Sequence, residues 1–176
     1  MKRQPSTSVA IARPWRRAAP PAQFRIPLAD ARQGTLARNW LLLGVAALGL
    51  SGVFSILLVL SRTPGMAGLF PVADFFRTAL VVHVDLSVLV WFVAFGGVFW
   101  TLACSARAAW LGKAALALAA LGTALLCAAP FVERAVPVMA NYVPVLDGPV
   151  FLSGLGLLAG AVVLVVARAI LFAAPL

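Results

Sequence analysis

The chain has 176 residues, of which 63% are hydrophobic and only 11% are charged. Soluble domains carry roughly 25% charged residues, so this composition excludes an ordinary soluble enzyme and indicates an integral membrane protein. The net charge of +9 does not indicate a nucleic-acid partner, because most of the basic residues precede the first apolar run and no basic, aromatic-interleaved face accompanies them. Their position instead indicates contact with membrane lipid.

Residues 1–38 are rich in proline, arginine and alanine, and the prolines are spaced so that no long helix can form. We expect a basic cytoplasmic tail, with a short interfacial helix at about 30–38 and Trp40 at the level of the headgroups. An arginine-rich start also resembles an organelle transit peptide, but the prolines disfavour that alternative. A bacterial inner membrane is therefore favoured over an organelle inner membrane.

Four apolar runs follow, and each is close to the ~20 residues that cross the hydrocarbon as a helix; they lie at about 40–61, 75–104, 110–130 and 149–173. A β-barrel would show short segments of alternating polarity, which the sequence lacks. We therefore predict an all-α integral membrane fold, with a four-helix transmembrane domain over residues 39–176.

The distribution of basic residues predicts the topology of these spans. If the N-terminus is inside, eleven basic residues fall in inside segments and three in outside segments. Cytoplasmic segments of membrane proteins carry the excess of lysine and arginine, so both termini are predicted to be inside, an N-in/C-in topology. The connection at 131–148 is then outside, and the three prolines of residues 131–149 favour a folded cap over that face of the membrane.

Small residues predict where the spans pack. Glycines and serines at 44–55 in the first span, and the GxxxG run from Gly156 to Gly160 in the last, favour close helix contacts. Pro130 is expected to end the third span. Arg168, near the end of the last span, is expected to extend its charge to the headgroups.

The second span contains the single histidine of the chain, His83, together with Arg77 and Asp85. An ionisable group at membrane depth is costly, so such groups usually face a cavity, a partner or a cofactor. Small residues one turn on either side, Ala79 and Ser87, are expected to leave room for a flat ligand such as haem. The alternative for His83 is a hydrogen bond to a neighbouring helix. Asp85 is expected to point to a different side of the helix.

The string RTALVVHVDLSVLVWF (77–92) resembles the second transmembrane helix of haem-copper oxidase subunit I, the core of cytochrome c oxidases. The stretch NYVPVLDGPVFLSGL (141–155) resembles the entry to the fourth helix of such subunits. The resemblance implies that His83 is an axial ligand of a low-spin haem iron and that Arg77 is a partner for a haem propionate. The alternatives for Arg77 are an ion pair with Asp74 and simple extension to the headgroups.

A complete subunit I takes its remaining haem and copper ligands from later helices, and this chain has no second histidine. The resemblance therefore implies the N-terminal part of a split or truncated core subunit. It would serve respiratory electron transport in an oxidoreductase complex, inactive without other transmembrane subunits. Two alternatives remain open: a cofactor-free structural or assembly subunit, and a homodimer in which two copies of His83 share one haem.

Overall fold

The computed structural model describes residues 30–70, 74–139 and 143–172. Within them, four helical spans are long and apolar enough to cross a membrane, which confirms the all-α, four-span membrane fold. The spans are α1 (Ala31–Arg62), the continuous run of α2 (Phe75–Val84), the π-helical segment η2 (Asp85–Val90) and α3 (Trp91–Ala103), then α4 (Ala109–Val132) and α5 (Pro149–Leu171). Residues 1–29 of the predicted tail lie outside the described residues.

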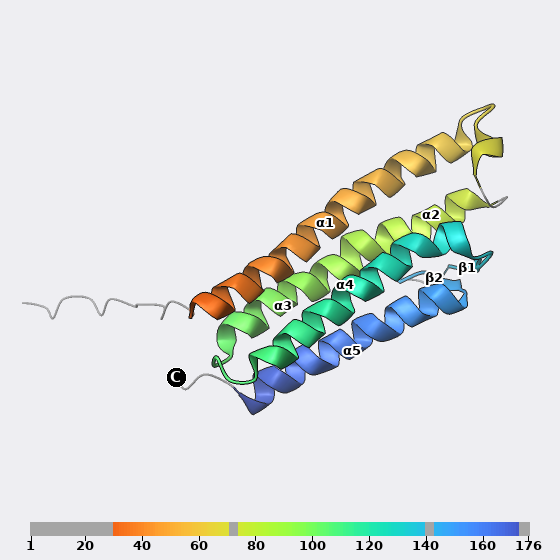
Figure 1. Ribbon diagram of the computed structural model, residues 1–176. Helices are drawn as coiled ribbons and strands as arrows, with labels where there is room; N and C mark the ends of the chain where they lie inside the picture. The colour runs from red at the N-terminus through yellow and green to blue at the C-terminus, as the bar shows by residue number, and fades with distance from the viewer. Residues whose placement is uncertain (1–29, 71–73, 140–142, 173–176) are drawn as a thin grey trace, which may run out of the picture.

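The second span lies in the middle of the bundle (Figure 1). It contacts α1 on one side and the α4–α5 pair on the other. At one end, the side-chain amide of Gln33 donates to the carbonyl of Cys104, and the amide of Ser105 donates to the carbonyl of Phe172 at 2.8 Å. The start of α1 and the end of α5 therefore lie at the same end of the bundle, as an even number of spans requires.

The α4–α5 contact depends on Gly122 and Gly154. A Cβ added at Gly122 would lie 2.7 Å from the Gly154 carbonyl oxygen, and one added at Gly154 would lie 2.9 Å from the Gly122 carbonyl oxygen. Of the predicted GxxxG pair, Gly156 has no described atom within 4 Å of an added Cβ, and Gly160 meets only Leu118, at 3.7 Å. Within the described chain, the close contact is therefore made by Gly154, two residues before the predicted motif.

The connection between α4 and α5 contains a small sheet that sequence reasoning did not predict. Strands β1 (Val136–Val138) and β2 (Val145–Asp147) pair antiparallel, with Pro137 opposite Leu146. Leu146, in the middle of β2, is fully buried. The prediction of a folded connection here is confirmed over its described residues, whereas residues 140–142 lie outside them.

The carboxylate of Glu133 anchors the start of α5. Its two oxygens accept hydrogen bonds from the backbone amides of Val150, at 2.9 Å, and Phe151, at 3.0 Å. Amides at the start of a helix have no partner within the helix, and a negative charge there is favoured by the helix dipole. Glu133 therefore joins the end of α4 to the first turn of α5.

Two predictions about the first span are wrong. The segment expected as a separate interfacial helix is the beginning of α1 itself, because Leu36 and Ala37 are buried against the bundle and hold it in line with the span. Trp40 is fully buried inside the bundle rather than facing the lipid, and its indole packs so closely on Gly97 that a Cβ there would overlap it. The domain boundary predicted at residue 38 therefore corresponds to no break in the helix.

Two further predictions fail in the C-terminal half. Helix α4 does not end at Pro130 but continues to Val132, because a proline in the last turn removes only one amide donor. Arg168 is fully buried, and its Nη2 donates to the Ser105 carbonyl at 3.1 Å. The guanidinium therefore bonds to the α3–α4 connection instead of extending to the membrane surface.

The orientation of the bundle remains a prediction, and labelling with an impermeant thiol reagent tests it. Met139 and Ala106 are exposed at opposite ends of the bundle, one beside the hairpin and the other in the α3–α4 connection. In sealed membranes, the Met139→Cys variant is expected to react from the outer side and Ala106→Cys only from the cytoplasmic side. The parent chain, whose Cys104 is buried and Cys127 half-buried, is the control. The reverse pattern would contradict the N-in/C-in topology.

Candidate functional site

His83 lies in the last turn of α2 and is held by one residue of α1. Its Nδ1 is 2.9 Å from both the hydroxyl and the carbonyl oxygen of Ser51, and the Ser51 hydroxyl is 3.0 Å from the carbonyl oxygen of His83. Ser51 is buried, in the part of α1 that faces the second span. The expected alternative of a hydrogen bond from His83 to a neighbouring helix is therefore present.

The geometry of this pair favours one tautomer of the imidazole. A carbonyl oxygen can only accept, so the 2.9 Å contact between Nδ1 and the Ser51 carbonyl is a hydrogen bond in the tautomer whose Nδ1 carries the proton. The Ser51 hydroxyl then donates its own proton to the carbonyl of His83. In a neutral imidazole, the other nitrogen is an acceptor with a free lone pair. The hydrogen bonds therefore leave Nε2 of His83 as the basic nitrogen.

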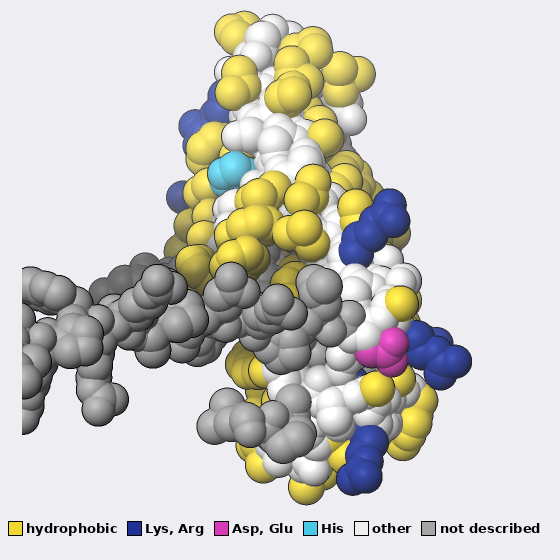
Figure 2. Space-filling view, turned by 90° about the vertical axis from the view of Figure 1, so that its left-hand side faces the viewer, with side chains coloured by type: hydrophobic (Ala, Val, Ile, Leu, Met, Phe, Trp, Pro, Cys, Tyr) yellow, Lys and Arg dark blue, Asp and Glu magenta, His cyan; other side chains and the backbone are white. Residues whose placement is uncertain are grey.

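The imidazole is half-buried, and Figure 2 shows it at the surface of the bundle among hydrophobic side chains. No residue in the described ranges forms a hydrogen bond with Nε2 of His83. A group that bound this nitrogen would therefore approach from outside the four-helix unit. Metal-ligating histidines almost always donate their other ring N–H to an acceptor, as Nδ1 does here. His83 thus has one ring nitrogen held by an acceptor, while the other nitrogen can bind a ligand.

The expected space beside His83 is only partly present. Ala79, one turn before it, is fully buried within the bundle. Ser87, one turn after it, is half-buried and donates to the carbonyl of His83 at 2.8 Å. The assumption of regular helical spacing fails here because η2 begins two residues after His83, and a π turn closes its hydrogen bonds over five residues.

The π-helical segment itself was missed by sequence reasoning, because no residue type in Asp85–Val90 distinguishes it from an α-helix. Such segments are rare and occur frequently at functional sites. Its first residue, Asp85, is fully buried, and neither carboxyl oxygen has a hydrogen-bond partner among the described residues. The second span therefore carries two unusual features within one turn of each other, an anchored imidazole and a buried carboxyl group.

Arg77 lies nearer the end of the span that carries the hairpin. Its Nε is 3.4 Å from Oδ2 of Asp74, and the two side chains are 62% and 52% exposed. This is the ion pair that the sequence left as an alternative, and an exposed pair of this kind contributes at most about 1 kcal/mol to stability. No described contact joins Arg77 to His83. Its role beside a haem propionate stays a prediction.

No group of three or more histidine, cysteine, aspartate or glutamate side chains in the described part of the chain is arranged to hold a metal ion. A haem iron needs only one protein nitrogen on one side, because its equatorial ligands belong to the porphyrin. A second histidine ligand for such an iron would come from another copy or another subunit, because the sequence contains no further histidine.

Comparison with known proteins finds two relatives. An uncharacterized protein of Rickettsia prowazekii (strain Madrid E) is 42% identical over 66 residues, which are 38% of this chain and 13% of that protein. An uncharacterized protein of Aquifex aeolicus (strain VF5) is 31% identical over 118 residues, 67% of this chain and 30% of that protein. The chain thus matches less than a third of either relative. No family model and no solved structure matches it.

Proposed function

We propose that this chain is the N-terminal four-helix part of a haem-copper oxidase-like core, with His83 as one axial ligand of a low-spin haem. The observation that carries the proposal is the hydrogen bond from Nδ1 of His83 to the Ser51 carbonyl, which leaves Nε2 free to bind iron. The haem, when bound, supplies one-electron transfer between an electron donor and the rest of a respiratory complex. The chain alone is not an active oxidoreductase.

In this proposal, the residues of the chain position the ligand. The Ser51 carbonyl fixes both the rotation of the imidazole and its tautomer, because the N–H must point to it. The rigid backbone of α1 supplies this acceptor, so the orientation does not depend on a mobile side chain. Arg77 is the cation proposed for a haem propionate, which requires its exposed ion pair with Asp74 to open or to be shared.

The proposal requires partner subunits, and three observations support this requirement. The free nitrogen of His83 is reached from outside the four-helix unit, so the haem would lie against further helices. In both relatives, the matched segment belongs to a much longer chain. Many large apolar side chains on the outer surfaces of α1 and α3 are exposed, as either lipid or partner helices would permit. Since both relatives are bacterial, the bacterial inner membrane is the proposed location.

A second candidate function is a cofactor-free structural or assembly subunit. The hydrogen bonds between Ser51 and His83 favour it independently, because they join α1 to α2 and satisfy one ring nitrogen without any ligand. In this case, His83 serves only to connect two helices.

Purification of the native complex through a C-terminal tag on this chain, in mild detergent, tests the proposal. We expect further transmembrane subunits to copurify, together with a low-spin haem that a reduced-minus-oxidised absorption spectrum detects. A homodimer with a shared haem would instead bind half as much haem per chain and contain no other subunit. Recovery of a stable, haem-free complex would reject the oxidase-like function and leave the structural subunit.

A further inference from the structure

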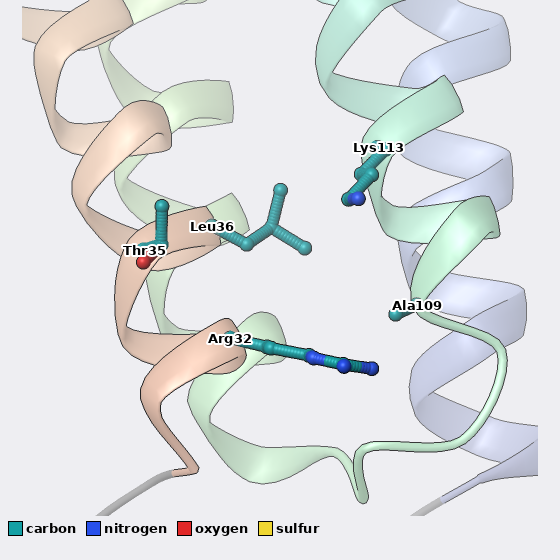
Figure 3. Close-up of a pocket in the computed structure, with 5 residues that line it drawn as sticks. All are labelled: Arg32, Thr35, Leu36, Ala109 and Lys113. Carbon is teal, nitrogen blue, oxygen red and sulfur yellow. The ribbon is translucent and has the colours of Figure 1, made fainter.

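A groove between α1 and α4 lies at the end of the bundle where both helices begin. Two adjoining cavities, of about 270 and 360 Å³, make up this groove and share the lining residues Arg32, Thr35, Leu36 and Lys113. Figure 3 shows Arg32 of α1 and Lys113 of α4 extending into the same space from opposite walls. The groove is therefore lined by two cations from helices that are far apart in the sequence.

The charge of this groove is unbalanced. No acidic side chain of the described residues lines either cavity. Among the described residues, neither Arg32 nor Lys113 takes part in an ion pair. Two like charges that converge on one space repel each other, so their arrangement favours an anion between them.

A third cation lies directly behind the wall of the groove. Arg168 is fully buried, and within the described chain its Nε and Nη1 have no hydrogen-bond partner. A Cβ added at Gly112 would lie 3.0 Å from Nη1 of Arg168 and 2.6 Å from Cδ2 of Leu36, which lines the groove. Gly112 therefore leaves room for the guanidinium of Arg168 beside Leu36, which lines the groove. A buried charge without a counter-ion is unfavourable, so it too favours an anion here.

The larger cavity also has an apolar part. It continues along α4 past Leu116, Ala117 and Ala120, which extends its lining by nearly two helical turns beyond Lys113. A free phosphate ion would use only the cationic end. An anionic phospholipid has a phosphate for that end and an acyl chain for the apolar part, and basic pockets between membrane helices bind such headgroups.

We infer that the groove between α1 and α4 is a binding site for an anionic phospholipid. The lipid phosphate lies between Arg32 and Lys113, and an acyl chain lies along Leu116, Ala117 and Ala120. Arg168 adds positive potential from behind without touching the lipid. The inference does not depend on haem binding, because the groove lies between α1 and α4 at the opposite end of the bundle from Arg77.

Lipid binding to the purified, delipidated full chain tests this inference, with native mass spectrometry as the measurement. The probes are phosphatidylglycerol and phosphatidylcholine with identical acyl chains. The Arg32→Gln and Lys113→Gln variants are each expected to bind phosphatidylglycerol about fivefold more weakly, and the double variant about 25-fold, as is typical of one basic side chain near an anionic surface. Binding of phosphatidylcholine is expected to be weak in all of them.

Two further variants separate the groove from net charge and from free phosphate. Arg38→Gln removes an exposed cation of α1 outside the groove and is expected to leave binding unchanged. Ala120→Trp fills the apolar part without changing charge and is expected to weaken phosphatidylglycerol binding. Equal losses in Arg38→Gln and Arg32→Gln, or equal affinity of the parent for both lipids, would overturn the inference. Displacement of the lipid by inorganic phosphate, or full binding to Ala120→Trp, would assign the cationic end to a free anion instead.

Discussion

The His83→Ala variant of the complex is expected to lose the whole low-spin haem band while the chain remains inserted and assembled. The imidazole is the only histidine ligand that this chain can supply, so its removal leaves the proposed iron site without its protein nitrogen. The substitution also removes one hydrogen bond to Ser51, which contributes about 0.5 to 1.5 kcal/mol and is too little to unfold the bundle. Reduced-minus-oxidised spectra of the purified complex, with immunodetection of the chain, measure both quantities.

Two matched variants show whether the loss is specific to the ligand. Ser51→Ala removes the hydroxyl but keeps the backbone carbonyl that binds Nδ1, so haem binding is expected to persist. Arg77→Leu is expected to keep the haem but lower its reduction potential, because a cation beside the propionates favours the reduced form. A full low-spin spectrum in His83→Ala would reject the oxidase-like function. In that case, the role of His83 is the connection of α1 to α2.

The Gly154→Val variant is expected to destabilise the bundle strongly, by about 1 to 3 kcal/mol or more, because it overpacks the α4–α5 contact. An added Cβ would already lie 2.9 Å from the Gly122 carbonyl oxygen and 3.1 Å from Cδ2 of Leu126, and valine adds two methyl groups beyond it. Neither the backbone of α4 nor a buried leucine can move aside easily. Thermal unfolding of the chain in mild detergent measures the effect.

Gly156→Val is the control for this prediction. It places the same side chain two residues further along α5, where a Cβ meets no described atom within 4 Å. We therefore expect the unfolding temperature of the isolated chain to remain close to that of the parent. Equal stability of the two variants would contradict the assignment of the α4–α5 contact to Gly154. A larger loss of unfolding temperature in Gly156→Val than in Gly154→Val would assign the α4–α5 contact to the predicted GxxxG motif.

Local composition was sufficient to predict the fold class of this protein and the position of its spans. Length and hydropathy alone placed four helices with ends within a few residues of those observed, apart from the earlier start of α1. They also placed His83, Arg77 and Asp85 on the second span. An ionisable residue in a membrane span is costly and rare, so it can be recognised from the sequence. These features depend only on neighbouring residues.

Which faces of the helices contact each other could be learned only from the tertiary structure. A membrane helix is apolar on all sides, so hydrophobic periodicity does not tell which face packs inward. The pairing of Ser51 with His83 joins residues 32 positions apart, and it depends on how α1 and α2 are rotated about their axes. The same rotations bury Arg168 and leave Gly156 exposed, although the sequence favoured the opposite for each. The chain thus encoded its helices locally, whereas the tautomer of His83 and the charged groove between α1 and α4 exist only because those helices pack together.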